Sequence, residues 1–128
     1  MQLLTILFVS DLARAVRFYD SVFEWPKTVD VPVYVEYELN VGARVGLMPQ
    51  SNTAHFLGRF GEGRYTDESA RAELYLSVPQ AQEYIERLQI AGASQLSPPV
   101  QRDWGDRVGY WRDLDGYVIA IAEPGSGI

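Results

Sequence analysis

The sequence predicts one α+β domain built from two similar halves, and three observations lead to this prediction. The chain has 128 residues, 47% hydrophobic and 22% charged, which is the composition of a globular domain large enough to fold without disulfides or structural zinc. Short apolar runs typical of strands alternate with two segments whose apolar residues follow a helical period. The order strand, helix, strands occurs twice along the chain.

The first half begins with a strand at 3–9, an apolar run rich in branched side chains. Asp11 has the side chain of an N-cap for a helix over 12–23, where apolar residues recur at i, i+3, i+4 and i+7. Trp25 and Pro26 end this helix, because the residue before a proline is disfavoured in helical conformation. The half is completed by a strand at 33–39, a turn at 40–42 and a strand at 43–48.

The second half follows a polar, glycine-rich segment at 51–70, which we expect to be a linker or mobile loop between modules at about 1–50 and 71–124. Pro79 opens a second helix, and Gly92 is its C-terminal stop. The strands expected in this half lie at 72–78, 95–101, 108–112 and 117–122.

An internal duplication is indicated by two turn glycines, Gly42 and Gly116, which are 74 residues apart. The same offset aligns strand residues of similar character in the two halves. The aligned pairs are Tyr37 with Trp111, Val45 with Ile119, Gly46 with Ala120 and Leu47 with Ile121. Turns and strands therefore coincide, as expected for two copies of one module.

The composition excludes several classes of function. With 17 acidic and 11 basic residues the net charge is -6, so the chain repels a phosphate backbone, and we expect no nucleic-acid partner. No run of about 20 apolar residues and no signal-peptide pattern occurs, so we expect a cytoplasmic protein without membrane contact. The chain has no cysteine and one histidine, which leaves carboxylate, amide, hydroxyl and aromatic chemistry. We expect His55 to be exposed or loosely packed in the glycine-rich segment.

Two segments carry a resemblance to a known family. The opening VSDLARAVRFYDSVFEW and the closing WGDRVGYWRDLDGYVIAIAE resemble the glyoxalase, bleomycin-resistance and extradiol-dioxygenase superfamily, also called vicinal oxygen chelate proteins. Leu114 stands where that family usually has a proline. The resemblance implies a single domain over 1–128 with two βαβββ modules, which form a curved mixed sheet around a cavity, usually in a homodimer.

The resemblance also implies where metal ligands would lie, on the first and last strand of each half. In the first half these positions are Leu4 or its neighbour Thr5, and Gly46. In the second half they are Glu73 and Ala120. Three of the four positions lack a donor, and a divalent cation needs about four to six donors. We therefore expect no metal site and no cofactor.

Strand alternation, with the family's ligand positions facing the cavity, indicates which residues line it. A mostly apolar lining with a few polar groups is typical of a small-molecule site, and aromatic rings near the rim could stack on a planar ligand. The candidate ligand-binding residues are Phe8, Arg44, Met48, Glu73, Tyr75, Trp104, Tyr110 and Trp111.

Several of these residues also have a purely structural interpretation. Arg44 and Glu73 could form an ion pair with each other. Tyr110 and Trp111 alternate on one strand, so one of the two belongs to the core. The acidic residues at 36 and 38 form either a solvated strand edge or, with Tyr34, an acidic aromatic surface for a cationic ligand.

Three functions follow from this pattern. The first is a metal-free protein of the bleomycin-resistance type that sequesters an aromatic or cationic compound such as an antibiotic. The second is a glyoxalase-like or dioxygenase-like enzyme, a lyase, isomerase or oxygenase, with an atypical metal site or with Glu73 as a buried general base. The third is a structural dimer whose cavity is filled by its own side chains.

Overall fold

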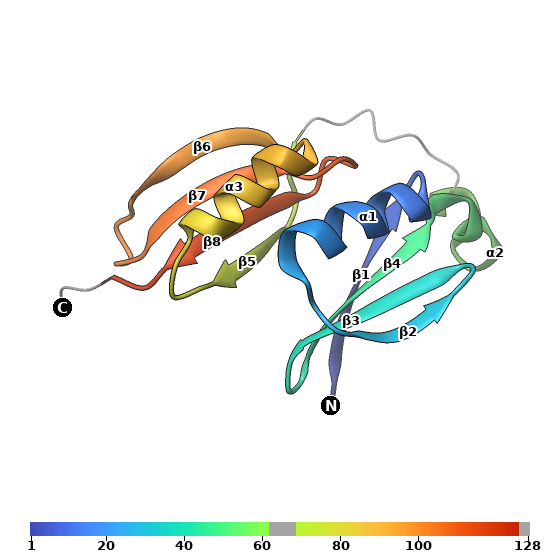
Figure 1. The fold of residues 1–128 in the computed structure, drawn as a ribbon. Helices are drawn as coiled ribbons and strands as arrows, with labels where there is room; N and C mark the ends of the chain where they lie inside the picture. Colours follow the sequence, from blue (N-terminus) through green and yellow to red (C-terminus); the bar gives the residue numbers. More distant parts are fainter. Residues whose placement is uncertain (62–68, 126–128) are drawn as a thin grey trace. The chain divides into compact units, whose positions relative to one another are not determined.

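The computed structural model describes residues 1–61 and 69–125. The chain forms two compact units, Met1–Glu68 and Ser69–Ile128, and each contains a four-stranded mixed sheet with one helix along it (Figure 1). The predicted α+β class with two βαβββ modules is therefore confirmed. Among the described residues, no helix is long and apolar enough to cross a membrane.

The first unit runs β1 (Leu3–Val9), α1 (Leu12–Phe23), β2 (Lys27–Val31), β3 (Tyr34–Asn40) and β4 (Ala43–Pro49). Its strands lie in the order β1-β4-β3-β2. The outer strand β1 is parallel to β4, and the other neighbours are antiparallel.

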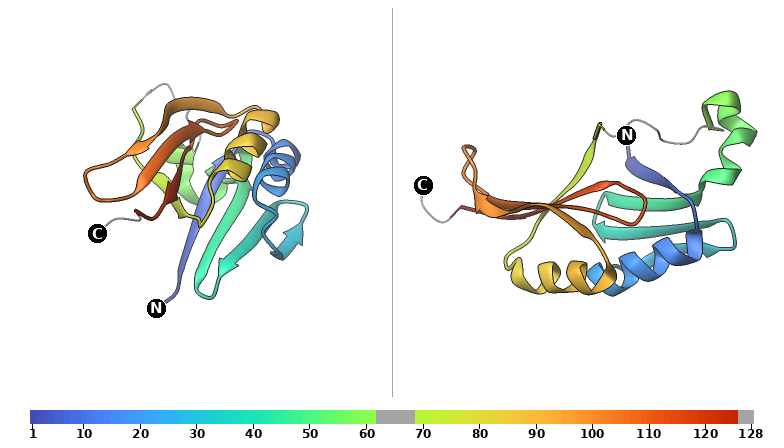
Figure 2. Two further views of the ribbon diagram at one scale, coloured as in Figure 1. Left: turned by 60° about the vertical axis from the view of Figure 1, so that its left-hand side comes forward. Right: turned by 90° about the horizontal axis from the view of Figure 1, so that it is seen from above.

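The second unit repeats this arrangement with β5 (Glu73–Ser77), α3 (Gln82–Ala91), β6 (Ser94–Gln101), β7 (Arg107–Arg112) and β8 (Val118–Glu123). Its strands lie in the order β5-β8-β7-β6, again with one parallel pair, β5 and β8. In both units the helix lies along one face of its own sheet (Figure 2).

The helix ends are those that the sequence predicts. The Asp11 carboxylate accepts a hydrogen bond from the backbone N–H of Arg14 at 3.0 Å, which caps the start of α1. At the other end Glu24 adopts a left-handed conformation with φ 57°, two residues before Pro26. Helix α3 begins at Gln82, a little after Pro79, and Gly92 ends it as expected, with its N–H directed to the Leu88 and Gln89 carbonyls.

The duplication is visible in the register of the strands. Tyr37 lies opposite Val45, and their counterparts Trp111 and Ile119 lie opposite each other. The turns also agree, because Gly42 and Gly116 have φ values of 84° and 91°. Glycine adopts this left-handed conformation at little cost. Both turns therefore need a glycine, and the 74-residue offset aligns these two glycines.

Two local predictions were wrong. The sequence analysis assigned no strand to β2, whose side chains are nearly all exposed, so the apolar alternation that marks a strand is absent. Part of the predicted loop is helical, with 3-10 turns at Gln50–Asn52 and Gly58–Gly61 around a single helical turn α2 (Ala54–Leu57). Residues 62–68 of that predicted loop lie outside the described residues.

The buried side chain of Thr53 explains why this helical segment is ordered. Its hydroxyl lies 2.7 Å from the Gln50 carbonyl and 3.0 Å from the Gly61 carbonyl. The Gln50 amide also donates to the Gly61 carbonyl at 2.9 Å. Polar side chains therefore join the two ends of the segment. An apolar helical pattern is not what holds it, so the sequence carries no periodic signal for it.

Each sheet has a helix face and an opposite face, which we call the open face. In the first unit the Tyr37 hydroxyl donates to the Asp20 carboxylate of α1 at 2.8 Å, so Tyr37 points to the helix. In the second unit Glu123 accepts from the backbone N–H of Ala81 at the start of α3, so Glu123 points to the helix. Residues that alternate with Tyr37 and Glu123 lie on the open faces.

The buried hydroxyl of Tyr37 yields a stability prediction. Tyr37→Phe should lower the free energy of unfolding by about 1 to 2 kcal/mol, because the Asp20 carboxylate loses a buried donor. Urea unfolding of both proteins measures this change. As a matched control, Lys27→Met removes the partly exposed ion pair of the same Asp20 and should cost less than about 0.5 kcal/mol. Equal costs for the two variants would contradict the assignment.

Candidate functional site

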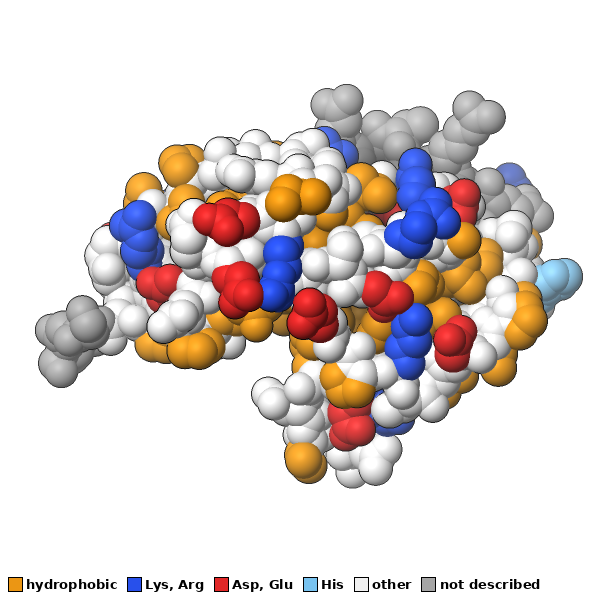
Figure 3. Space-filling view, viewed as in Figure 1, with side chains coloured by type: hydrophobic (Ala, Val, Ile, Leu, Met, Phe, Trp, Pro, Cys, Tyr) orange, Lys and Arg blue, Asp and Glu red, His pale blue; other side chains and the backbone are white. Residues whose placement is uncertain are grey.

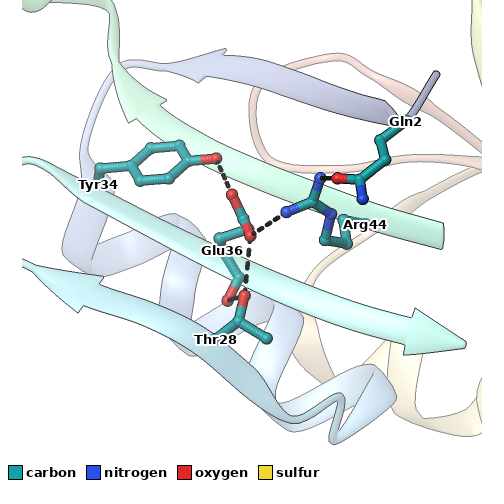
Figure 4. Close-up of polar contacts among 5 residues, drawn as sticks. All are labelled: Gln2, Thr28, Tyr34, Glu36 and Arg44. Carbon is teal, nitrogen blue, oxygen red and sulfur yellow. Dashed lines mark hydrogen bonds and ion pairs between the residues drawn. The ribbon is translucent and has the colours of Figure 1, made fainter. Parts of the chain in front are cut away.

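The open face of the first unit carries a polar cluster around Glu36, which is only 6% exposed (Figure 4). Its carboxylate accepts hydrogen bonds from Tyr34 at 2.8 Å, Thr28 at 2.9 Å and Arg44 at 3.2 Å. The Arg44 guanidinium donates a further hydrogen bond to the Gln2 side-chain carbonyl at 3.2 Å. Four side chains from β2, β3, β4 and the residue before β1 thus surround or extend one buried carboxylate.

The cluster shifts the protonation equilibria of its members. The hydrogen bond from Tyr34, with those from Thr28 and Arg44, holds the pKa of Glu36 below its ordinary value despite burial, which acts in the opposite direction. Burial, and then the hydrogen bond to Glu36, raises the pKa of Tyr34 to about 12. At neutral pH the cluster therefore contains an ionised Glu36 and a neutral Tyr34 beside the Arg44 guanidinium.

Gly46 allows Tyr34 to lie across the sheet. A Cβ atom at position 46 would lie 2.8 Å from Cε1 and Cζ of the Tyr34 ring, which is too close for ordinary packing. The space beside Gly46, one of the ligand positions that lack a donor, is therefore taken by the Tyr34 ring.

The open face of the second unit carries a different cluster, formed by Tyr75, Trp104 and Asp106. The Tyr75 hydroxyl donates to the Asp106 carboxylate at 2.6 Å and accepts from the Trp104 indole N–H at 2.8 Å. Trp104 is 58% exposed and Tyr75 is 38% exposed. Two accessible aromatic rings are therefore held beside a carboxylate.

Arg102 fixes the hairpin that presents this cluster. Its guanidinium donates to the Val108 carbonyl at 2.8 Å and to the Ser97 hydroxyl at 2.9 Å. It also lies 5.1 Å from the centre of the Tyr110 ring, a cation–π contact. Tyr110 in turn packs on a fully buried apolar group that includes Ala120. These contacts connect the hairpin to the sheet and leave Trp104 in a defined place.

The predicted ligand-binding residues fall into two groups, one in each unit. Phe8, Arg44 and Met48 lie half-buried on the open face of the first unit. Tyr75 and Tyr110 lie on the open face of the second unit, where Trp104 bonds to Tyr75. Glu73, on the same strand as Tyr75, is also in the second unit.

Four expectations need correction. Trp111 is fully buried and alternates with Tyr110, so it belongs to the core and Tyr110 is the member of the pair on the open face. Glu73 is exposed, not the buried carboxylate that a general base of this kind requires, and the ion-pair partner of Arg44 is Glu36. Glu36 itself is buried and hydrogen-bonded, so it is not part of a solvated edge.

Three residues of the two clusters, and Arg102 beside the second cluster, were not predicted from the sequence. Thr28 and Gln2 come from segments whose side chains are mostly exposed, and they give no periodic signal. Asp106 and Arg102 flank the predicted Trp104 in the hairpin, and this proximity was the available signal. His55 is exposed, as expected (Figure 3).

Comparison with known proteins places the chain in a family. The model of the glyoxalase-like domain matches residues 2–126, nearly the whole chain. The chain belongs to the glyoxalase-like domain family. The resemblance to the glyoxalase, bleomycin-resistance and dioxygenase superfamily is thereby confirmed. A separate search of curated protein sequences found no match.

Solved structures show the same fold as this glyoxalase-like domain. A glyoxalase-related enzyme from Fulvimarina pelagi is 25% identical, with a TM-score of 0.78 over 96% of this chain and 87% of that one. A glyoxalase/bleomycin resistance protein/dioxygenase family enzyme from Burkholderia phytofirmans is 16% identical, with a TM-score of 0.81 and coverages of 94% and 96%. The fosfomycin resistance protein FosX from Mesorhizobium loti is 20% identical, with a TM-score of 0.68 and coverages of 98% and 92%.

The residues of this glyoxalase-like domain do not fit the metal centre that the resemblance implies. Leu4, Gly46 and Ala120 offer no side-chain donor, and the side of Gly46 that a ligand would use is covered by the Tyr34 ring. Ala120 lies in a fully buried apolar group. Among the described residues, no three side chains of the His, Cys, Asp or Glu types are close enough to hold a metal ion together. No step of a reaction is therefore assigned to a metal.

The contact between Gly46 and Tyr34 can be tested by a double-mutant cycle. Gly46→Ala should lower the free energy of unfolding by about 1 to 3 kcal/mol, because the added methyl group displaces the Tyr34 ring. The same substitution in a Tyr34→Ala background should cost much less. Urea unfolding of the four proteins gives both values, and the same cost in both backgrounds would show that the ring does not limit position 46.

The shifted pKa values predict a pH dependence with two signs. Because the pKa of Glu36 is lowered on folding, its contribution to stability is present above the ordinary glutamate pKa and is lost as pH falls through the lowered value. Because the pKa of Tyr34 is raised to about 12, its contribution is lost as pH rises from the ordinary tyrosine value of about 10.

Urea unfolding across a pH series measures both effects. Glu36→Gln should flatten the acid limb of the stability profile and weaken the alkaline loss without removing it, because burial is the larger cause of the raised Tyr34 pKa. Tyr34→Phe should reduce the alkaline loss further. An acid limb of unchanged slope in Glu36→Gln would contradict the assignment. Phenolate absorbance of the folded protein provides a second measure of Tyr34, whose signal should be among those that titrate late.

Proposed function

We propose that this glyoxalase-like domain is a metal-independent protein that binds a small, planar, cationic compound. The observation that carries the proposal is the Tyr75, Trp104 and Asp106 cluster, in which two exposed aromatic rings stand beside a carboxylate. In this proposal the protein is cytoplasmic and homodimeric, and it sequesters its ligand instead of transforming it.

The chemistry of the cluster supports a cation over an anion. A cation over an indole or phenol ring gains about 0.5 to 2 kcal/mol, and aromatic stacking adds about 0.5 to 1.5 kcal/mol. The Asp106 carboxylate, held at 2.6 Å from the Tyr75 hydroxyl, adds a fixed negative charge beside the rings. The net charge of -6 on the whole chain attracts the same class of ligand.

The comparisons support a role of this kind without deciding it. One structural neighbour is a fosfomycin resistance protein, and another comes from a family whose description includes bleomycin resistance. The unsuitable metal positions of this chain favour binding over metal-dependent turnover. An antibiotic-like compound is accordingly the type of ligand that we propose.

Isothermal titration with a matched pair of compounds tests the proposal. N-Methylquinolinium should bind about tenfold more tightly than 1-methylnaphthalene, which has the same shape and no charge. Trp104→Leu should abolish most of the binding, and Asp106→Asn should remove most of the preference for the cation.

The matched control is Asp103→Asn, which removes a carboxylate from the same hairpin. The Tyr75 hydroxyl bonds to Asp106 and Trp104 and not to Asp103. This variant should therefore bind as the unmodified protein does. Two results would overturn the proposal. One is equal affinity for the two compounds, and the other is cation binding that Trp104→Leu leaves intact.

A further inference from the structure

The two modules differ most on their open faces, although they share one fold. The offset of 74 residues aligns Tyr34, Glu36, Glu38 and Arg44 with Val108, Tyr110, Arg112 and Val118. In the second unit Val108 is fully buried and Val118 nearly so. The second unit therefore has a valine at the position of the Arg44 guanidinium and Tyr110 at the position of the buried Glu36 carboxylate, so the fold itself requires neither charge. Since burying such charges is costly, a role in recognition is the simplest reason for them.

Arg44 has hydrogen-bonding capacity that no side chain in the described part of the chain uses. It donates through Nη1 to Glu36 and through Nη2 to Gln2, whereas a guanidinium carries five N–H donors. Its side chain remains 29% exposed. Two anchors restrict its motion before any ligand arrives, which lowers the entropy cost of binding. Arg44 is therefore prepared to receive an acceptor such as a carboxylate.

Glu38 provides a complementary negative charge next to Arg44. The two residues are direct partners in the antiparallel pair of β3 and β4, so their Cβ atoms are roughly 5 Å apart on the same face. Among the described residues, no ion pair or side-chain hydrogen bond involves the Glu38 carboxylate, because Arg44 pairs with Glu36 instead. With Glu36, Glu38 and Arg44 the local charge is negative by one unit.

Apolar side chains border these charges on the neighbouring strand. In the parallel pair of β1 and β4, Leu4 lies opposite Arg44, Ile6 opposite Gly46 and Phe8 opposite Met48. Leu4, Ile6 and Phe8 are half-buried on the open face. An apolar strip thus begins beside Arg44 and extends away from it.

A ligand with only a carboxylate would add to the negative charge around Arg44. A ligand with only a cationic group could pair with Glu38 but would leave the Arg44 donors without an acceptor. A ligand that carries both groups satisfies both residues. We propose that this open face is a second binding site, for an α-amino acid with an apolar side chain or a compound with the same head group. The carboxylate binds Arg44, the ammonium binds Glu38, and the side chain lies along Ile6 and Phe8. All residues of this proposed site belong to the first unit.

Isothermal titration with three compounds that share a phenyl group tests this assignment. L-Phenylalanine should bind, and 3-phenylpropanoate and phenethylamine, which each lack one charged group, should bind about tenfold more weakly. Glu38→Gln should weaken phenylalanine binding about tenfold and leave 3-phenylpropanoate unchanged. Arg44→Lys, which keeps a cation beside Glu36, should weaken phenylalanine and 3-phenylpropanoate and spare phenethylamine.

Thermal melting of each variant shows that it folds, and Glu83→Gln, which removes an exposed carboxylate from α3, is the control expected to bind normally. The proposal is overturned if phenylalanine does not bind at millimolar concentration, or if phenethylamine binds as tightly as phenylalanine. It is also overturned if neither folded variant changes the affinity for phenylalanine. Trp104→Leu should leave phenylalanine binding intact, which separates this site from the proposed cation site.

Discussion

Each sheet of this protein is covered by its own helix on one face only, and this one-sided cover determines the role of almost every strand residue. Side chains that point to the helix are locked in the core, as the Tyr37 hydroxyl bonded to Asp20 of α1 shows. Side chains that alternate with them are not needed to attach the helix. They are free to carry charge or exposed aromatic surface, so the two candidate sites occur on the open faces.

The two modules have used this freedom in different ways. The first unit holds an ionised carboxylate, Glu36, with three donors, whereas the second unit has Tyr110 at the aligned position, packed on the buried apolar residues Val108, Ala120 and Ala122. The helix faces differ in one detail. Tyr37 finds a partner in α1, but the indole N–H of its counterpart Trp111 is buried and has no hydrogen-bond partner among the described residues. The larger Trp111 ring fills the core of the second unit, and its buried indole N–H without such a partner lowers the stability of the fold.

The sequence predicted the features that depend on neighbouring positions along the chain. The Asp11 cap, the end of α3 at Gly92 and the alternation that separates the open faces from the helix faces all follow local rules. Contacts between strands were harder to predict. The burial of Glu36 depends on donors from two other strands, Thr28 of β2 and Arg44 of β4, and on Tyr34 of its own strand. The exposed strand β2 is held by pairing with β3 instead of by an apolar pattern.

The covered glycine also limits how this chain can change. A donor side chain at position 46 would meet the Tyr34 ring at once, so a substitution there is penalised before any metal can bind. Removing Tyr34 first would take a donor from the buried Glu36. Each substitution is therefore unfavourable when it is made alone. The two positions are coupled, so a change at one alters the effect of a change at the other.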